Sequence, residues 1–244
     1  MMENDLFNKR ILITGGARRI GKELVLACAQ SGASIILHHS SSDDEASDTA
    51  HQARQYGVNV EIIKADFSNP VESIQLFEKY LENDKSLYGL VNNASIFEPI
   101  KFADTTITSW QAHLNINLTM PFLLSQLLQR KIGNKLGRIV NILDWRALRP
   151  GKDHFPYTIS KAALSSMTKS LALALSPNIS VNGIALGAIL PPSDNSDTSD
   201  IIKSVPAGRW ASMRELSDTV LFLLSGPQYI TGEIIHLDGG RHLV

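Results

Sequence analysis

A tyrosine and a lysine four residues apart have the clearest potential for chemistry in this sequence. They are Tyr157 and Lys161, at the start of a stretch with a helical pattern. Residues four apart share one face of a helix, so the ammonium group should lie beside the phenol. A cation there favours the phenolate and should lower the pKa of Tyr157 from about 10, which suits proton transfer near neutral pH. Alone, such a pair is common and usually structural.

Other polar residues come where apolar segments end. Asp144 closes one segment, thirteen residues before Tyr157, and the run 92–95 (Asn-Asn-Ala-Ser) closes an earlier one. Asn117 lies in the long helical stretch that follows this run. Ligands of open α/β sheets bind beyond the carboxyl ends of the strands, so these positions are candidates for a binding site.

A glycine-rich turn connects the first apolar segment to the first helical stretch. The sequence of residues 14–21 is Thr-Gly-Gly-Ala-Arg-Arg-Ile-Gly. Such a turn lets backbone N–H groups approach a pyrophosphate, which the positive end of the helix dipole also favours. Gly15 would form the tight turn, and Gly21 would allow close packing of helix and strand. A lone glycine-rich turn is a weak signal, but here it opens a chain of alternating strands and helices.

Short apolar segments alternate with helical patterns along almost the whole chain. The segments lack strict alternation, as in strands covered on both faces. This pattern predicts one α/β domain over 1–244, with a Rossmann-like, doubly wound parallel sheet of about seven strands and helices on both faces. The expected strands are Arg10–Thr14, Ser34–His39, Asn59–Lys64, Tyr88–Asn92, Arg138–Leu143, Ser180–Ala185 and Glu233–Asp238. The expected helices cover about 19–31, 43–56, 70–84, 106–131, 156–176 and 213–225.

Composition excludes several functions. The 244 residues carry 23 Lys+Arg against 24 Asp+Glu, a net charge of −1, which disfavours general nucleic-acid binding. Cys28 is the only cysteine, and the histidines have no metal-ligand spacing, so we expect neither a disulfide nor a metal site. No apolar run is long enough to span a bilayer, and residues 1–10 lack the apolar core of a secretory signal. We therefore expect a cytoplasmic protein that does not enter a membrane.

The end of the second expected strand bears on the choice of cofactor. An acidic residue there usually holds the free ribose 2′-hydroxyl of NAD(H), but this chain has His38 and His39, followed by Ser40–Ser42. The serines and Arg18 could instead hold a 2′-phosphate, which favours NADP(H). The carboxylates at 43–44 count against a phosphate, and the serines could also serve only to cap the next helix.

Over essentially its full length the chain resembles the short-chain dehydrogenase/reductase family. The matching features are the turn at 14–21, Asp66, the run 92–95, Asn117, Tyr157 with Lys161, and the Asp-Gly-Gly at 238–240. The resemblance implies that Asn117, Tyr157 and Lys161 form a proton relay, with Lys161 also binding the nicotinamide ribose. It implies a homotetramer as well. The cofactor-binding residues that it suggests are Gly15, Arg18, Arg19, Ile20, His39, Ser40, Ser41, Asp66, Phe67, Asn93, Ala94, Ser95, Tyr157, Lys161, Gly187 and Ile189.

Two departures from the common family pattern are informative. Arg19 stands where most relatives have glycine, and Asp144 where most have serine. A carboxylate repels the partial negative charge of a ketone oxygen but suits a substrate that offers N–H donors. Both changes, with the run 93–97, resemble the pteridine reductase branch. The ending 238–243 and the Asp144–Trp145 pair resemble its dihydromonapterin reductase members.

That branch implies a pocket for a flat pterin. Phe97 would stack on the pterin, Arg19 would bridge it to the cofactor pyrophosphate, and Ser95 would hydrogen-bond its ring. Asp144 and Tyr157 complete the expected substrate-binding set, and Asp144 joins the catalytic one. A substrate loop is expected at about 188–211, with the polar stretch 191–200 as a poorly ordered lid. The family's Pro-Gly pair appears here as Leu186-Gly187, so the nicotinamide-side loop departs from the pattern.

The sequence therefore predicts an NADPH-dependent reductase of a dihydropterin, similar to dihydromonapterin or dihydrobiopterin. One alternative is a ketone or 3-oxoacyl reductase of the same family, which Asp144 disfavours. The other is a protein that senses NADP(H) without turnover, which the retention of Tyr157, Lys161 and Asn117 disfavours. His154 is near the expected site, but we interpret it as a loop residue.

Overall fold

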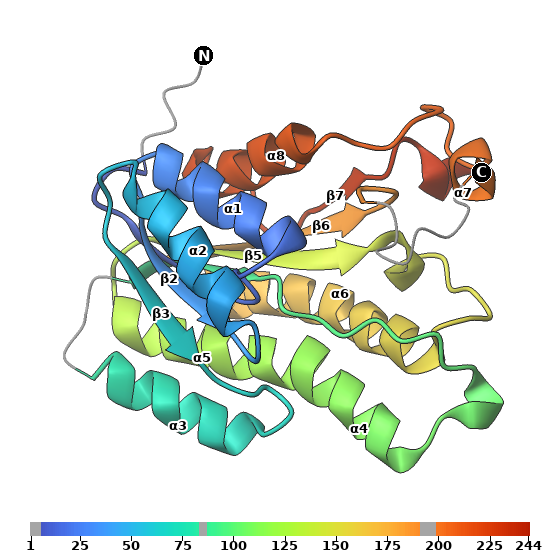
Figure 1. Ribbon diagram of the computed structural model, residues 1–244, viewed down its shortest axis with the longest axis horizontal. Coiled ribbons are helices and arrows are strands. Elements are labelled where there is room, and N and C mark those ends of the chain that lie inside the picture. Colours follow the sequence, from blue (N-terminus) through green and yellow to red (C-terminus); the bar gives the residue numbers. More distant parts are fainter. Residues whose placement is uncertain (1–5, 83–86, 191–198) are drawn as a thin grey trace.

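The computed structural model describes residues 6–82, 87–190 and 199–244 and contains one central sheet (Figure 1). All neighbouring strands are parallel, in the order β3-β2-β1-β4-β5-β6-β7. The strands are β1 Arg10–Ile13, β2 Ser34–His39, β3 Val60–Lys64, β4 Leu87–Asn92, β5 Gly137–Asp144, β6 Ile179–Leu186 and β7 Ile234–Leu237. The predicted Rossmann-like fold class is confirmed.

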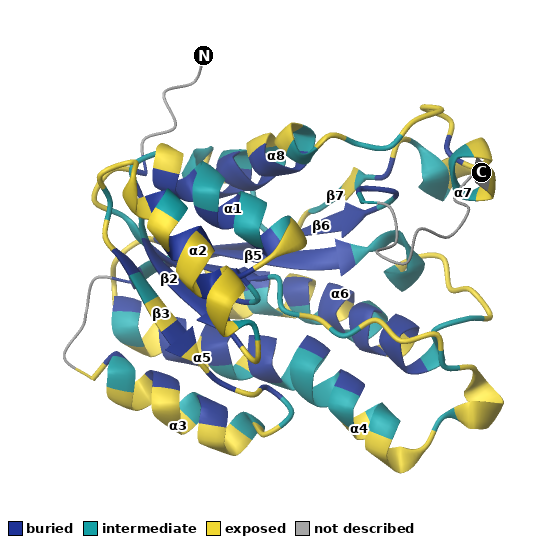
Figure 2. Ribbon diagram, in the orientation of Figure 1, coloured by how far each residue is buried: buried dark blue, intermediate teal, exposed yellow. Residues whose placement is uncertain are grey.

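Burial explains why these segments form strands. All eight residues of β6 are buried, as are the first seven of β5. Ile, Val and Leu fit such strands because both faces of a parallel sheet are covered. The edge strand β7 is only partly buried. Figure 2 shows that the central strands and the inner faces of the helices are buried.

Helices cover the sheet in two layers (Figure 1). One apolar core includes side chains of α1, α2 and α8, and a second core on the other face includes those of α3, α5 and α6. The helices are α1 Arg19–Gln30, α2 Asp43–Arg54, α3 Pro70–Tyr80, α4 Ile107–Leu114, α5 Met120–Ile132, α6 Phe155–Leu175, α7 Ser199–Lys203 and α8 Met213–Ser225.

The expected helix over 106–131 is interrupted. A π-helical segment, Asn115–Thr119, separates α4 from α5. Such segments insert an extra residue into a helical turn and are frequent at functional sites. The short α7 is a further element that the polar sequence around it did not predict. Of the expected substrate loop and lid, residues 191–198 lie outside the described part of the structure.

The strand order places the candidate residues together. From β1 the chain adds strands first on one side, to β2 and β3, and then on the other, to β4. The switch point between β1 and β4 is where ligands bind in such sheets. The glycine-rich turn follows β1 and the run 92–95 begins at the end of β4, so both lie at this point.

Candidate active site

The glycine-rich turn after β1 is held by close backbone approach. Gly15 has a φ of +63°, which favours glycine. A Cβ atom on Gly21 would lie 1.8 Å from the Gly15 carbonyl oxygen and 2.9 Å from Asn93 Nδ2. Asn93 Nδ2 donates hydrogen bonds to the carbonyl oxygens of Thr14 (2.9 Å) and Gly15 (3.1 Å). The side chain that follows β4 therefore ties down the turn that follows β1.

A cavity of about 430 Å³ opens along this turn. The expected cofactor residues line it, with the exception of Tyr157, Lys161, Gly187 and Ile189. Its lining residues are Gly15, Ala17, Arg18, Arg19, Ile20, Gly21, His38, His39, Ser40, Ser41, Ser42, Asp66, Phe67, Asn93, Ala94, Ser95, Ile96 and Ile116.

Gly187 and Ile189 have packing roles in the structure. The Gly187 N–H donates to the Leu237 carbonyl oxygen (3.0 Å), and a Cβ atom on Gly187 would lie 2.6 Å from Asp238 Cα. Glycine is therefore needed there for close approach of the two segments. Ile189 is buried in the core that contains α8.

His38 supports the turn in a way that the sequence did not reveal. Its Nδ1 accepts the Gly15 N–H (3.2 Å), so Nε2 carries the proton and donates to the Ala65 carbonyl oxygen (3.0 Å). Its ring stacks on Phe67 at 3.9 Å between centroids. Burial lowers the pKa of His38 from 6.5 to about 4. Only the neutral ring can accept from Gly15, because protonated Nδ1 has no free lone pair.

His39 and the residues after it define the end of β2. His39 is buried, and its Nδ1 has no hydrogen-bond partner within the described residues. Ser40–Ser42 line the cavity beside it. The Asp43 carboxylate forms an ion pair with Lys64 (2.7 Å), and this contact lowers the pKa of Asp43. Asp43 is therefore a weaker objection to a phosphate than the sequence suggested, and donors at this position fit a phosphorylated ribose.

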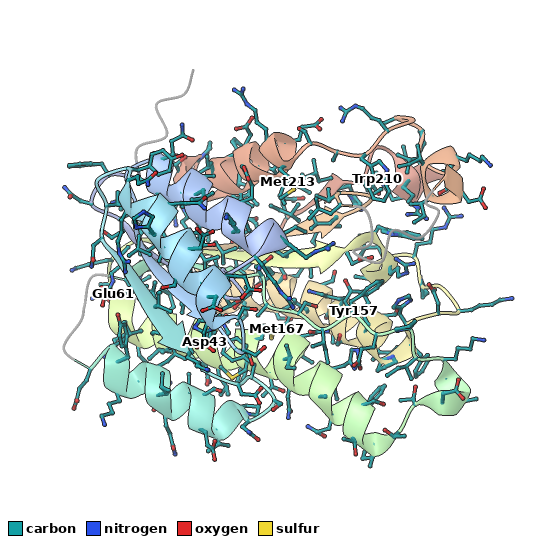
Figure 3. All side chains as sticks on the ribbon, in the orientation of Figure 1. Asp43, Glu61, Tyr157, Met167, Trp210 and Met213 are labelled. Carbon is teal, nitrogen blue, oxygen red and sulfur yellow. The ribbon has the colours of Figure 1, made fainter. Side chains whose placement is uncertain are left out.

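The second part of the site joins β5 to α6. Tyr157, labelled in Figure 3, lies on α6. Its Oη donates a hydrogen bond to Asp144 Oδ2 (3.0 Å), at the end of β5. Asp144 Oδ1 accepts the Arg146 backbone N–H (2.8 Å) and caps the short 3₁₀ helix Trp145–Ala147. One carboxylate oxygen thus fixes the orientation of Asp144, and the other faces the phenol.

The electrostatics of this pair correct one expectation. Burial, followed by the charge of Asp144, raises the pKa of Tyr157 well above 10. The expected lowering by Lys161 is therefore wrong for this structure. Lys161 Nζ donates instead to the Ile142 carbonyl oxygen (2.8 Å), and burial lowers the pKa of Lys161 to about 8. Tyr157 consequently holds its proton at neutral pH and is poised as a donor.

Asn117 joins the site as a connector between two segments. Asn117 lies in the π-helical segment. Its Oδ1 accepts hydrogen bonds from the Ile96 N–H (3.0 Å) and from Ser95 Oγ (3.1 Å). Its Nδ2 donates to the Ile96 carbonyl oxygen (3.1 Å) and to Ser160 Oγ (3.0 Å). Ser160 in turn donates to the Tyr157 carbonyl oxygen (2.7 Å). Asn117 therefore holds the segment after β4 against the first turn of α6.

Phe97 lies beside Tyr157. Half of its surface is exposed, and the edge of the Tyr157 ring approaches it at 4.6 Å between centroids. His154 stacks on Phe97 at 3.9 Å, and the His154 Nδ1 lies 2.9 Å from Asp153 Oδ2. His154 also has a φ of +54°. His154 lies in the loop immediately before α6, and its ring packs against Phe97.

Arg19 adopts a left-handed backbone conformation. Its φ of +52° lies in the region that favours glycine. Glycine is also the residue that the family resemblance predicts at this position. The conformation costs an arginine about 1–2 kcal/mol. The side chain lines the cavity at the start of α1, so a strained position coincides with the candidate binding site.

Within the described ranges, no cluster of three or more His, Cys, Asp or Glu side chains could hold a metal ion. In the same ranges, no helix has the length and apolar character needed to cross a membrane.

Together, the sheet topology, the glycine-rich turn and the Tyr–Lys pair define an oxidoreductase of the Rossmann-like class. A family model described as enoyl-(acyl carrier protein) reductase matches residues 15–242. The chain belongs to the short-chain dehydrogenase/reductase family.

Relatives with different names are similar to this chain. An uncharacterized oxidoreductase, YohF, of Escherichia coli (strain K12) is 34% identical over 94% of each chain. The 3-oxoacyl-[acyl-carrier-protein] reductase FabG of Aquifex aeolicus is 33% identical over 98% of this chain and 99% of its own. The crystal structure of FolM alternative dihydrofolate reductase 1 from Brucella canis, complexed with NADP, has a TM-score of 0.89 and 34% identity, and covers 98% of this chain and 96% of its own.

The neutral state of His38 predicts a pH dependence of stability. A folded pKa of about 4 against 6.5 when unfolded means that the unfolded chain binds more protons between these values. The contribution of neutral His38 to the free energy of unfolding is complete above pH 6.5. It decreases as the pH falls to 4, by about 3 kcal/mol in total. Urea unfolding of wild type and His38→Gln across this pH range measures the free energy of unfolding. As the pH falls, this free energy should decrease more steeply in the wild type than in the variant.

Parallel stability curves for wild type and His38→Gln would contradict this role. If the variant does not fold, the ring signals of His38 can be titrated by NMR in the wild type. A midpoint near 6.5 would then refute the buried neutral state.

Arg19→Gly should make the fold more stable. Relief of about 1–2 kcal/mol of backbone strain exceeds the roughly 0.5–1 kcal/mol that glycine loses in chain entropy. Urea unfolding measures the change, with Asn8→Gly as a matched control, since Asn8 also has a positive φ (60°) but tolerates it better. A lower stability of Arg19→Gly than of wild type would mean that the contacts of the arginine outweigh its strain.

Proposed function

We propose that this protein is an NADPH-dependent reductase of a dihydropterin, with dihydromonapterin- or dihydrobiopterin-like substrates. The observation that carries the proposal is the Asp144 carboxylate at the end of β5, hydrogen-bonded to Tyr157. Substrate N–H groups can donate to a carboxylate, whereas a ketone offers it only an electron-rich oxygen. A dihydropterin offers an amino group and ring N–H groups as donors, and so meets the requirement of Asp144.

Asp144 and Tyr157 have complementary tasks in this proposal. When bound, a reduced nicotinamide would supply the hydride needed to reduce a C=N bond of the pterin. The Tyr157 hydroxyl delivers the proton to the ring nitrogen, either directly or through Asp144 and water, so that one hydride and one proton saturate the bond. The raised pKa of Tyr157 supports this task, because the proton is held until the substrate accepts it.

Other side chains would position the ring. The exposed part of Phe97 offers an aromatic face, and His154 behind it fixes the ring plane of Phe97. Ser95 and Arg19 line the adjoining cavity and are the proposed hydrogen-bond partners of the pterin. Lys161, anchored on Ile142, is the proposed partner of the nicotinamide ribose.

NADPH as the cofactor is supported by the end of β2. Ser40, Ser41 and Arg18 line the cavity, and His39 carries an unsatisfied buried ring nitrogen. Burial lowers the pKa of His39, and a neutral ring can still donate one hydrogen bond. The related FolM structure from Brucella canis was crystallised with NADP.

A steady-state assay tests the proposal. NADPH oxidation is followed with dihydromonapterin, dihydrobiopterin, dihydrofolate and a 3-oxoacyl ester, each under the same conditions. Turnover of a dihydropterin well above that of the ester is expected. Preferred turnover of the ester would favour a 3-oxoacyl reductase, which the similarity to FabG of Aquifex aeolicus makes the second candidate. Tight NADPH binding without turnover of any of them would favour a sensor.

Assembly and location are further parts of the proposal. Exposed apolar side chains on the long helices, such as Phe122 on α5 and Leu173 on α6, support self-association as a homotetramer. A cytoplasmic location agrees with a reductase that draws on the NADPH pool. Sedimentation analysis distinguishes a tetramer from smaller forms.

Arg18→Ala should weaken NADPH binding and leave NADH binding nearly unchanged. A hydrogen bond to the charged 2′-phosphate contributes roughly 1.5–3 kcal/mol, and NADH lacks that group. Fluorescence titration of wild type and variant with both nucleotides gives the dissociation constants. Equal losses for the two nucleotides, or wild-type binding of NADH as tight as that of NADPH, would contradict the assignment.

A further inference from the structure

A second cavity, of about 710 Å³, has Trp145, the residue that follows Asp144, in its lining. Three parts of the chain form it: the turn after β5, the segment that includes α7, and the C-terminal segment. Figure 1 shows α7 and the C-terminal end close together, beyond the carboxyl ends of β6 and β7. The lining residues are Trp145, Arg149, Pro150, Lys203, Ser204, Pro206, Arg241 and Val244.

The lining of this cavity is strongly cationic. Arg149, Arg241 and Lys203 contribute three positive charges and no acidic side chain contributes to the lining. Lys203 has an exposed ion pair with Asp200 (2.9 Å), but neither Arg149 nor Arg241 forms an ion pair with any described residue. Like charges at such positions repel one another unless an anion neutralises them.

Two carboxylates whose charges act on Arg241, those of Asp238 and Asp144, already accept hydrogen bonds from other groups. Asp238 accepts the backbone N–H of Gly240 (3.0 Å) and that of His242 (2.9 Å). Asp144 accepts from Arg146 and Tyr157. Both carboxylates are thus hydrogen-bonded to other groups, and although their charges favour the Arg241 cation, neither forms an ion pair with it.

The tryptophan holds the arginine in a defined position. The Arg241 guanidinium lies 4.2 Å from the centroid of the Trp145 ring, and that of Arg146 lies 5.1 Å from it. Stacking on an aromatic ring leaves the N–H groups of a guanidinium free to donate in its plane. Trp145 directly follows Asp144, so the ring on which Arg241 stacks is next to Asp144 along the chain.

We propose that this cavity, with Arg149, Arg241 and Lys203 around Trp145, binds an anionic group on the side chain of the substrate. The inference rests on the proposed function, because it takes the ring to be reduced at Asp144 and Tyr157 while its substituent extends past Trp145. Guanidinium groups recognise carboxylates and phosphates through paired hydrogen bonds. The anion is therefore either a carboxylate or a phosphate ester.

Kinetic comparison of three dihydropterins tests the proposal. They are dihydromonapterin, which has a neutral side chain, its phosphate ester, and dihydrofolate, whose tail carries carboxylates. The quantity compared is the ratio of kcat/KM for a charged substrate to that for the neutral one. For at least one charged substrate the ratio should exceed 1 in the wild type and fall by about 10- to 100-fold in Arg149→Gln and Arg241→Gln. The control Arg130→Gln, a cation on α5 paired with Glu78, should leave it unchanged.

The two charged substrates distinguish the sources of the anion. A loss confined to the phosphate ester identifies a phosphate site, and one confined to dihydrofolate identifies a carboxylate site. Ratios that are the same in wild type, both variants and the control would overturn the inference while leaving the proposed function intact.

Direct binding separates this inference from the proposed function. If no pterin is reduced, the proposed function fails, and calorimetric titration with inorganic phosphate and with glutarate still tests the cavity. Binding to wild type that is lost in the Arg149→Gln/Arg241→Gln double variant supports an anion site. Equal binding, or none to either protein, refutes it.

Discussion

The hydrogen bond from Tyr157 to Asp144 is the interaction on which the proposed chemistry of this protein depends. It joins the end of β5 to the first turn of α6, so it forms only when the sheet and its covering helix are both in place. Neighbouring hydrogen bonds hold the two residues in position. The Arg146 N–H fixes Asp144, and Ser160 and Asn117 tie the start of α6 to the segment after β4. A fixed, buried phenol that faces a partly buried carboxylate favours a proton held on oxygen over a free phenolate.

Strained backbone conformations and close backbone contacts also occur around the candidate site. Arg19 and His154 have left-handed backbones, and each lies beside a ring or cavity of the candidate site. Gly21 permits an approach that no larger residue allows. Such features cost stability and persist only where surrounding contacts enforce them. The buried sheet provides such contacts, since its inner strands are packed on both faces.

The sequence predicted the strands and most helices because continuous apolar segments and helical periods are local signals. The positions of Gly15, Asn93, Asp144 and Tyr157 followed from motif spacing on that framework. The role of His38 did not, because it depends on contacts with Gly15 and Ala65, which lie far away in the chain. The pKa of Tyr157 was mispredicted because spacing reveals the nearby lysine but neither the depth of burial nor the facing carboxylate.

The most direct measurement is the dihydropterin turnover of Asp144→Asn, with the NADPH dissociation constant determined in parallel. Asparagine keeps an oxygen to cap the Trp145–Ala147 helix but removes the charge and the proton-accepting group that faces Tyr157. If Asp144 takes part in proton transfer, kcat should fall by about 10²–10⁴-fold while NADPH affinity changes little. Turnover within a few-fold of wild type would mean that Asp144 only caps the turn after β5, and would contradict the central claim.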